Sequence, residues 1–408
     1  MNKRILQINT VVNWGATGII TEKIGKVILK NSWSSFIAYG RYDRLSDSKL
    51  IKIGNKFDFY ADVLKTRLFD EHGFGSENAT NDFIEKVKKI KPDIIHLHNI
   101  HGYYINIKIL FEYLKQSNLP VVWTLHDCWS FTGHCAHYTV VDCQKWQKQC
   151  YSCPQTSRYP ASIFLDNSKK NYLEKKTIFN SLSKLTLIPV SEWLEGEVRK
   201  SFFKDVDIKM INNGIDLEMF NIRKLNLSKL KYKIPKKFII LGVASVWTKE
   251  KGLNDFIELR ELLGNDIQIV LIGLNKSQLK KMPIGITGIE RTENQRELAD
   301  MYNLADVYIN LTWEDTFPTT NLEAIACGTP IITYDVGGSP EAITPETGFV
   351  VQKKEYFEII EKVKEIKANG KDYYSTYCRE RALQKYNQND RFKEYFNLYE
   401  EILGHSDL

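Results

Sequence analysis

The sequence predicts an α/β protein made of two doubly wound, Rossmann-like domains. Its 408 residues are too many for one ordinary hydrophobic core and suit two domains of roughly 200 residues each. In both halves, short apolar runs typical of buried strands alternate with amphipathic segments, which is the pattern of parallel sheets covered by helices. An apolar fraction of 43% belongs to a globular chain and argues against disorder.

The first half opens with a strand, a glycine-containing loop and a helix. Residues 5–9 are an apolar run, and Gly15 and Gly18 follow before apolar residues recur at helical spacing. In such a domain, ligands bind beyond the carboxyl ends of the strands. The glycines do not form Gly-x-Gly-x-x-Gly, and the second strand, residues 36–39, ends in Gly40 rather than in the acid that holds an NAD ribose, so a dehydrogenase is disfavoured.

Two further strands of the first half end in polar residues. These candidate binding residues are His98, Asn99 and His101 after residues 92–97, and His126 and Asp127 after residues 120–125. We expect the two groups to lie together, because the carboxyl ends of parallel strands line the ligand crevice. A lone buried histidine is more often structural, which is the interpretation favoured for His96.

Five of the seven cysteines lie between Cys128 and Cys153. In a chain without a secretion signal, this density favours thiolates on a metal over disulfides. Only Cys150 and Cys153 have the spacing of a zinc knuckle. We therefore predict a structural zinc held by Cys135, Cys143, Cys150 and Cys153, with free buried thiols or a disulfide as the alternatives.

Domain boundaries follow from changes in pattern along the chain. We expect a first domain at residues 1–221, a linker rich in Lys and Leu at residues 222–235, and a second domain at residues 236–385. Aromatic residues recur at helical spacing in the last segment, residues 386–408, which indicates a core-facing helix.

The second half begins with a strand at residues 238–243, followed by Lys249 and Lys251 near the start of a helix. A cation at a helix N-terminus is unfavourable unless an anion lies between, so these lysines indicate a phosphate site; a solvated pair is the alternative. Further strands are predicted at residues 267–272 and 284–288.

The most informative stretch connects strands at residues 307–311 and 331–334. A loop with Asp315 leads into a short helix that opens near Thr319 and carries Glu323. The helix start directs unpaired N–H groups into the loop and is suited to a phosphate. The two carboxylates would hold sugar hydroxyls on either side of it, which describes a nucleotide-sugar. The alternative is that Asp315 and Asn321 cap the helix and Glu323 only complements the helix dipole.

The run from Asp315 to Ile332 resembles the Glu-x7-Glu signature of retaining glycosyltransferases of family 4. That family has the GT-B fold, in which two Rossmann-like domains face each other across a cleft. The resemblance implies that Asp315 faces the transferred sugar and that Glu323 holds the nucleotide ribose. It also implies donor contacts from the intervening segment, which contains Phe317, Thr319, Thr320 and Asn321.

Two positions depart from the family pattern. Asp315 stands where the family has Glu, which leaves Glu314 as an alternative functional acid. Pro318 stands where the family has Gly, and because proline has no N–H, one backbone contact to the donor is lost.

The resemblance assigns roles at other positions too. Lys251 would neutralise the diphosphate, Lys249 would replace an arginine that the family has upstream, and His126 would contact the donor sugar. The remaining implied donor residues are Gly15, Gly18 and Arg291. On the acceptor side we expect His98, Asn99, His101 and Asp127.

The stretch from Thr124 to Cys135 is similar to a bacterial subgroup that builds exopolysaccharide and O-antigen, colanic acid enzymes included. The implied activity is a retaining transfer of a hexose from a UDP- or GDP-sugar to a hydroxyl of a glycan, lipid-linked in that subgroup. The transfer would need no cofactor, and its catalytic residues would be His126, Lys251 and Asp315.

Composition narrows the alternatives. A net charge of +6 suits an anionic small molecule or membrane surface but is too small for a nucleic-acid arm. Without an apolar run long enough to span a bilayer, we expect a cytoplasmic protein, with peripheral contact at the inner membrane face as an option. A nucleotide-sugar epimerase of GT-B build and a noncatalytic nucleotide-sugar binder remain alternatives.

Overall fold

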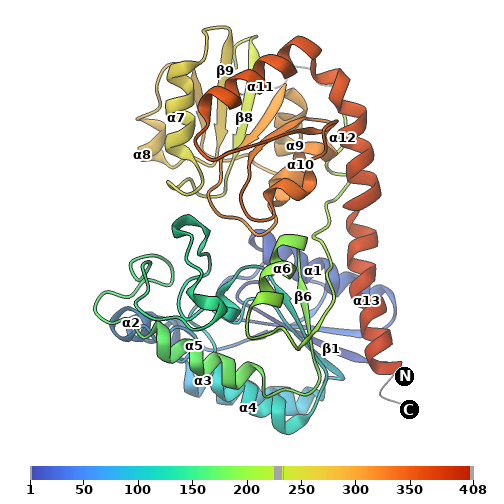
Figure 1. Cartoon of the computed structure of the whole chain (residues 1–408). Coiled ribbons are helices and arrows are strands. Elements are labelled where there is room, and N and C mark those ends of the chain that lie inside the picture. The colour runs from blue at the N-terminus through green and yellow to red at the C-terminus, as the bar shows by residue number, and fades with distance from the viewer. Residues whose placement is uncertain (1, 225–231, 233, 405–408) are drawn as a thin grey trace. The chain divides into compact units, whose positions relative to one another are not determined.

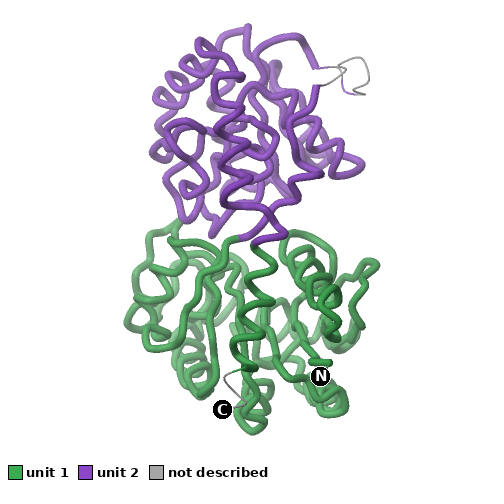
Figure 2. The backbone as a smooth tube through the Cα atoms, turned by 90° about the vertical axis from the view of Figure 1, so that its right-hand side faces the viewer, with its two compact units in different colours: residues 1–212, 391–408 green, residues 213–390 purple. Residues whose placement is uncertain are grey.

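The computed structural model describes residues 2–224, 232 and 234–404. The chain divides into two compact units (Figure 2): unit 1 contains residues 1–212 and 391–408, and unit 2 contains residues 213–390. Both are α/β units with a parallel sheet, so the predicted fold class of two Rossmann-like domains is confirmed. Part of the predicted linker at residues 222–235 lies outside the described residues.

Unit 1 contains a seven-stranded parallel sheet with the order β3-β2-β1-β4-β5-β6-β7 (Figure 1). Its strands are β1 (Arg4–Asn9), β2 (Ser34–Tyr39), β3 (Lys49–Lys52), β4 (Ile94–Leu97), β5 (Val121–Leu125), β6 (Leu185–Pro189) and β7 (Asp207–Ile208). The order reverses between β1 and β4, and ligands of doubly wound folds bind beyond the strand ends at such a point.

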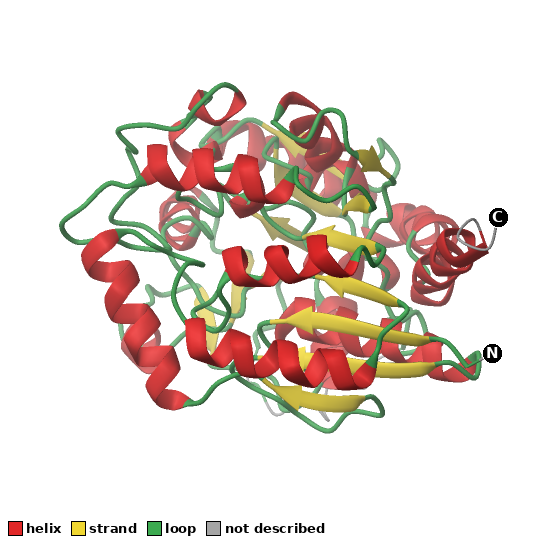
Figure 3. Ribbon diagram, turned by 90° about the horizontal axis from the view of Figure 1, so that it is seen from below, coloured by secondary structure: helices red, strands yellow, loops and turns green. Residues whose placement is uncertain are grey.

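Helices pack along the sheet of unit 1 (Figure 3). They are α1 (Gly15–Lys30), α2 (Lys56–Phe69), α3 (Glu77–Ile90), α4 (Ile107–Ser117), α5 (Ser168–Phe179) and α6 (Glu192–Lys200). The last helix of the chain, α13 (Gln388–Gly404), buries Phe392, Tyr395 and Tyr399 in the same core cluster as Ile5 and Ile94 of the sheet. Its aromatic stripe therefore faces a protein core.

Unit 2 contains a six-stranded parallel sheet with the order β10-β9-β8-β11-β12-β13. Its strands are β8 (Phe238–Val243), β9 (Ile267–Ile272), β10 (Ile286–Ile289), β11 (Val307–Asn310), β12 (Ile331–Tyr334) and β13 (Gly348–Val351). Its helices are α7 (Leu253–Leu262), α8 (Lys276–Leu279), α9 (Gln295–Leu304), α10 (Thr319–Ala326), α11 (Tyr356–Asn369) and α12 (Lys371–Lys385). The order reverses between β8 and β11.

The predicted strand at residues 284–288 is wrong at its start. The observed strand β10 begins at Ile286, and Ile284 is fully exposed. Gly285 has a φ of +90°, which turns the chain just before the strand, so an apolar residue in the turn was mistaken for strand.

None of the described helices combines the length and apolar character that a bilayer span requires.

Candidate functional site

In unit 2, the loops after β8 and β11 meet where the strand order reverses. The first loop carries Lys251 and the second carries Asp315, and the Lys251 Nζ lies 3.0 Å from the Asp315 Oδ2. The same Nζ approaches the Glu314 main-chain oxygen at 3.4 Å. Of these two neighbouring acids, Asp315 is therefore the one whose carboxylate pairs with the lysine.

Two glycines allow these loops to pack tightly. Gly252 has a φ of +80°, and a Cβ there would lie 2.3 Å from the main-chain oxygen of Leu311. Gly337 has a φ of +58°, and a Cβ there would lie 1.9 Å from the main-chain oxygen of Asp315. The Gly338 N–H donates to this same oxygen at 3.2 Å. Glycine is therefore required where the first loop packs on Leu311 and where the chain at Gly337 packs on Asp315.

The electrostatics of Lys251 are governed by the acids beside it. Burial by itself would lower the pKa of its ammonium group, but the nearby Asp315 and Glu314 carboxylates outweigh burial and raise that pKa. With 38% of its side chain exposed, Lys251 is a fixed positive charge that solvent or a ligand can still reach.

Helix α10 starts at Thr319, directly after this loop. Pro318 is its N-cap, and no side chain caps the helix, so Asp315 and Asn321 do not have the capping role considered above. The N–H groups of the first turn have no capping side chain to bind, and a helix start of this kind attracts anions. The Asn321 amide is used inside the unit, since its Oδ1 accepts from Asn310 and its Nδ2 donates to the Ser339 main-chain oxygen.

Glu323 lies one turn into α10, where the Tyr302 hydroxyl donates to its Oε2 at 2.9 Å. Burial raises the pKa of its carboxyl group to about 7, while the bond from Tyr302 acts in the opposite direction. The Tyr308 hydroxyl is bonded to Thr320 and lies within electrostatic reach of both Glu323 and Asp315. Asp315 and Glu323, the two acids of the predicted motif, therefore both lie near the Tyr308 hydroxyl.

The other predicted donor residues of unit 2 are more dispersed. Phe317 is buried against Tyr386, and Arg291 is exposed. Lys249 is exposed, with its Nζ 5.5 Å from the centre of the Trp313 ring. Lys353 and Lys354 approach the same ring at 5.1 Å each, so three lysines gather around Trp313. We did not predict Lys353 and Lys354; the only signal was a basic pair just after the apolar run of β13.

In unit 1, Gly15 and Gly18 belong to the turn between β1 and α1. Gly15 has a φ of +61° and is the first residue of α1. A Cβ on Gly18 would lie 3.0 Å from the Val11 Cγ2 and 3.1 Å from the Asn13 nitrogen, so this helix start lies close to the loop before it.

The five polar residues predicted at the ends of β4 and β5 come together in unit 1. They line one small cavity of about 10 Å³: His98, Asn99, His101, His126 and Asp127. The His101 Nε2 lies 2.8 Å from the Asp127 Oδ2, and the Trp129 N–H donates to the Asp127 Oδ1 at 2.9 Å. Burial would raise the pKa of Asp127, but His101 outweighs this effect and holds that pKa at about 2.

A chain of hydrogen bonds sets the tautomer of His126. The Gln7 Nε2 donates to the Thr21 main-chain oxygen at 3.0 Å, which turns the Gln7 Oε1 toward the His98 Nε2 at 3.2 Å. His98 must therefore donate from Nε2 and accept at Nδ1, where the His126 Nε2 lies at 3.1 Å. His126 then carries its proton on Nε2, and Nδ1 is its acceptor nitrogen. We call Gln7, His98 and His126 the histidine chain.

Both imidazoles of the histidine chain are neutral at pH 7. Burial lowers the pKa of His126 to about 4 and that of His98 well below its usual range. Gln7 was not predicted; its signal was a polar side chain inside the otherwise apolar run of β1, where it is fully buried.

His96 lies next to the histidine chain. It bonds the hydroxyls of Tyr399 and Thr124 and thereby joins β4 to α13 and β5.

The four cysteines of the predicted zinc site line a single cavity elsewhere in unit 1.

Comparisons with known proteins identify the family. The family model for glycosyltransferase family 4 matches residues 65–219, and the model for glycosyl transferases group 1 matches residues 227–385. Over 98% of its length, the chain is 24% identical to the whole of the colanic acid biosynthesis glycosyl transferase WcaC, described as putative, from Escherichia coli K12. Together the two models match most of the chain, which therefore contains a glycosyltransferase family 4 domain followed by a group 1 domain.

Further similarities place the chain among sugar-transferring enzymes. It is 25% identical to the N,N'-diacetylbacillosaminyl-diphospho-undecaprenol α-1,3-N-acetylgalactosaminyltransferase of Campylobacter jejuni, over 73% of this chain and 81% of that protein. The solved structure of Anabaena HepE with UDP and glucose superimposes with a TM-score of 0.68 at 12% identity, covering 98% of this chain and 99% of that one. The fold is GT-B, and the protein is a glycosyltransferase of polysaccharide biosynthesis.

Proposed function

We propose that this glycosyltransferase moves a hexose from a UDP-sugar to a hydroxyl of a lipid-linked glycan, with retention of the anomeric configuration. The observation that carries the proposal is the pairing of Lys251 with Asp315 beside the uncapped start of α10. Together these groups offer a cation, backbone N–H donors and a carboxylate at the strand ends where doubly wound folds bind ligands. The HepE structure contains UDP and glucose, which supports UDP among the candidate nucleotides.

In this proposal, unit 2 holds the diphosphate. Breaking the bond between the sugar C1 and its phosphate oxygen leaves a growing negative charge on the diphosphate. Lys251 and the N–H groups of Thr319 and Thr320 stabilise that charge more strongly in the transition state than in the ground state. Lys249, Lys353 and Lys354 add a positive field around Trp313. The role of the cation thus falls to side chains, and the transfer itself is assigned no cofactor.

The acids and the histidine chain orient hydroxyl groups. Glu323 accepts hydrogen bonds from the nucleotide ribose, and Asp315 accepts from the sugar. His126 is neutral with Nδ1 as its acceptor nitrogen, so it would accept a hydrogen bond from a sugar hydroxyl rather than donate one. The acceptor oxygen bonds C1 on the face that the diphosphate leaves, and its proton passes to the departing phosphate oxygen.

The acceptor is the least constrained part of the proposal. The Campylobacter relative is named for an undecaprenol-linked substrate, which supports a lipid-linked glycan. Such an acceptor is presented at a membrane, so we propose that the protein works at the inner membrane face.

A two-step experiment tests the function. The full chain is screened for thermal stabilisation by UDP- and GDP-sugars, and the best binder is incubated with lipid-linked oligosaccharide acceptors. NMR of the product should show the anomeric configuration of the donor. Inversion would contradict the retaining mechanism, and interconversion of the nucleotide-sugar without acceptor would instead indicate an epimerase.

A further inference from the structure

The segment between β5 and α5, residues 126–167, has little regular structure. It contains three short 3-10 turns, η1 (Trp129–Phe131), η2 (Thr139–Val141) and η3 (Lys145–Gln147), and otherwise consists of loops. Connections of about forty residues are uncommon in compact domains unless they are functional or held by other constraints. This raises the question of what fixes its conformation.

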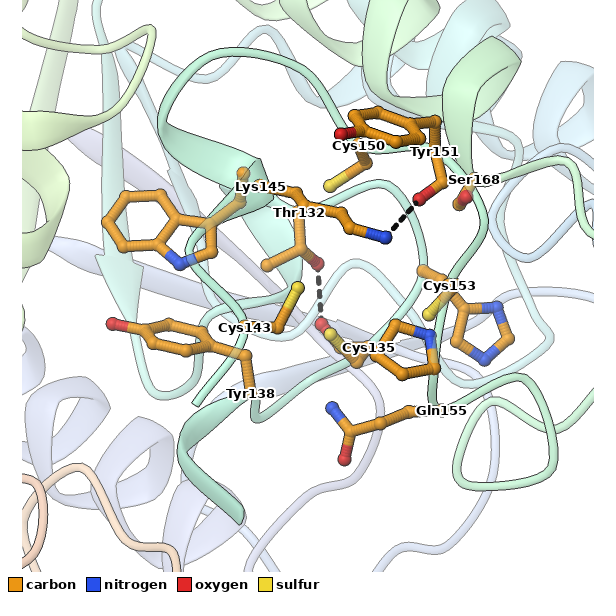
Figure 4. A pocket seen from close by; sticks show the side chains of 13 residues that line it. Thr132, Cys135, Tyr138, Cys143, Lys145, Cys150, Tyr151, Cys153, Gln155 and Ser168 are labelled. Carbon is orange, nitrogen blue, oxygen red and sulfur yellow. Dashed lines mark hydrogen bonds between the residues drawn. The ribbon is translucent and has the colours of Figure 1, made fainter. Parts of the chain in front are cut away.

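Four cysteines of this segment surround one cavity (Figure 4). They are Cys135, Cys143, Cys150 and Cys153. The cavity has a volume of about 20 Å³, which accommodates a water-sized group but neither a nucleotide nor a sugar. A ligand matched to this space is a single ion.

Hydrogen bonds hold the sulfur atoms at the cavity. The Gly133 N–H donates to the Cys150 Sγ at 3.2 Å. The thiols of Cys135 and Cys153 are hydrogen-bonded to each other. Ser152 has a φ of +43°, which turns the chain between Cys150 and Cys153 so that both reach the cavity.

Lys175 is buried beside the cavity, and burial lowers the pKa of its ammonium group to about 7. Lys175 of α5 is 1% exposed, and its Nζ donates to the main-chain oxygens of Trp129 and Thr132 at 2.8 and 3.1 Å. Burying an ammonium group among neutral acceptors is costly unless negative charge is near. Four acidic groups interact electrostatically with Lys175: the thiols of Cys150 and Cys135 and the carboxylates of Asp127 and Asp70. The two carboxylates are also bonded to histidines, Asp127 to His101 and Asp70 to His134.

We propose that Cys135, Cys143, Cys150 and Cys153 bind one structural Zn²⁺ that cross-links this segment. Four thiolates form a closed tetrahedral site, which supports folding and leaves no open position for chemistry. The zinc–thiolate centre carries net negative charge and so favours the charged form of Lys175. Among the described residues, no three His, Cys, Asp or Glu side chains are already arranged as a metal site, so zinc binding must rotate the cysteine side chains inward.

His134 lines the same cavity and is the competing ligand. Its Nδ1 lies 2.5 Å from the Asp70 Oδ1, an arrangement also common at metal-bound histidines. The ligand set therefore needs its own test.

The first measurement is the metal content of untagged full-length protein, purified without chelator. Mass spectrometry of the elements should find one zinc per chain. Release of that zinc by a thiol-modifying reagent, followed with a chromogenic chelator, should consume four thiols. Absence of zinc together with four freely alkylated cysteines, or a disulfide between Cys135 and Cys153, would overturn the proposal.

Variants then separate the ligands. Cys143→Ser and Cys150→Ser should contain about tenfold less zinc per chain, because a site that has lost one ligand binds zinc far more weakly. Cys128→Ala is the matched control, since Cys128 belongs to the same segment but does not line the cavity. It should retain the zinc, and so should His134→Gln. Zinc that is lost in His134→Gln but kept in Cys143→Ser would overturn the four-cysteine set. Cobalt substitution of the wild-type protein gives a further check through thiolate-to-metal absorption bands if the serine variants do not fold.

Discussion

In unit 1 the polar residues at the strand ends are bonded to one another, whereas in unit 2 the charged groups at the strand ends remain accessible. His98 is 1% exposed and is bonded on both ring nitrogens, to Gln7 and to His126. Lys251 has one carboxylate partner, and 38% of its side chain is exposed. The first arrangement fixes the direction of neutral hydrogen-bonding groups; the second keeps a charge ready for a ligand.

This difference fits the two parts of a nucleotide-sugar. A diphosphate is recognised mainly by charge and by N–H donors, and a positive group remains effective over several ångströms. Sugar hydroxyls are recognised by the direction of individual hydrogen bonds, which requires groups of known tautomer. Substitutions in unit 2 should therefore change the rate more strongly than substitutions in unit 1.

The largest effect is expected for Lys251→Ala. Loss of this cation should reduce kcat by about 10²–10³, the scale measured for removal of one preorganised donor. Steady-state kinetics with the best UDP-sugar measure the effect. Lys249→Ala is the matched control: this exposed lysine lies over the Trp313 ring, whereas Lys251 pairs with Asp315, so its loss should cost much less. Near-normal turnover by Lys251→Ala would refute its role.

The second prediction concerns Glu323, whose carboxyl pKa burial raises from 4.5 to about 7. Between these values the folded chain keeps a proton that the unfolded chain loses, so this group makes stability fall as pH rises. Glu323→Gln should therefore stabilise the protein more at pH 8 than at pH 5, by about 2 kcal/mol. Denaturant unfolding at both pH values measures the difference. The same variant should bind donor more weakly at pH 8, because an amide accepts ribose hydrogen bonds less strongly than a carboxylate.

Several strands were predictable because the pattern of residues within each one is enough to identify it as a strand. The expected strands at residues 238–243, 267–272 and 331–334 coincide with β8, β9 and β12. Strands buried on both faces have continuous apolar runs, and turn residues bound them. Ile284 was misassigned because its residue type favours a strand, and the sequence alone does not show that this isoleucine lies exposed in a turn.

The missed residues depend on contacts that are distant in sequence. Gln7 is significant only because β1 lies beside β4, which brings it to His98. Lys353 and Lys354 approach Trp313 because β13 pairs with β12, which in turn pairs with β11. A single sequence predicts the strands but does not specify which of them are neighbours.

A smaller effect is expected for Asp127→Asn in unit 1. His101 holds the pKa of Asp127 at about 2, below its ordinary value of 3.8, so the ionised carboxylate stabilises the folded state above that ordinary value. The variant should lower the free energy of unfolding at pH 7 by about 1 kcal/mol. The difference from wild type should shrink as the pH falls toward 2. An equal difference in unfolding free energy at pH 7 and near pH 2 would show that the ionised Asp127 carboxylate is not what stabilises the fold.

The smallest effect is expected for His98→Leu, which removes the acceptor that fixes the His126 tautomer. A lost hydrogen bond of ordinary strength predicts a decrease of about threefold in kcat/KM. NMR of the imidazole nitrogens should show His126 protonated on Nε2 in the wild type and a mixture of tautomers in the variant. His98→Asn places an amide near the former Nδ1 and can accept the same hydrogen, so it should restore both the tautomer and the rate. If His98→Leu and His98→Asn behaved alike, the residue would act by filling space, and the histidine chain would have no role in directing His126.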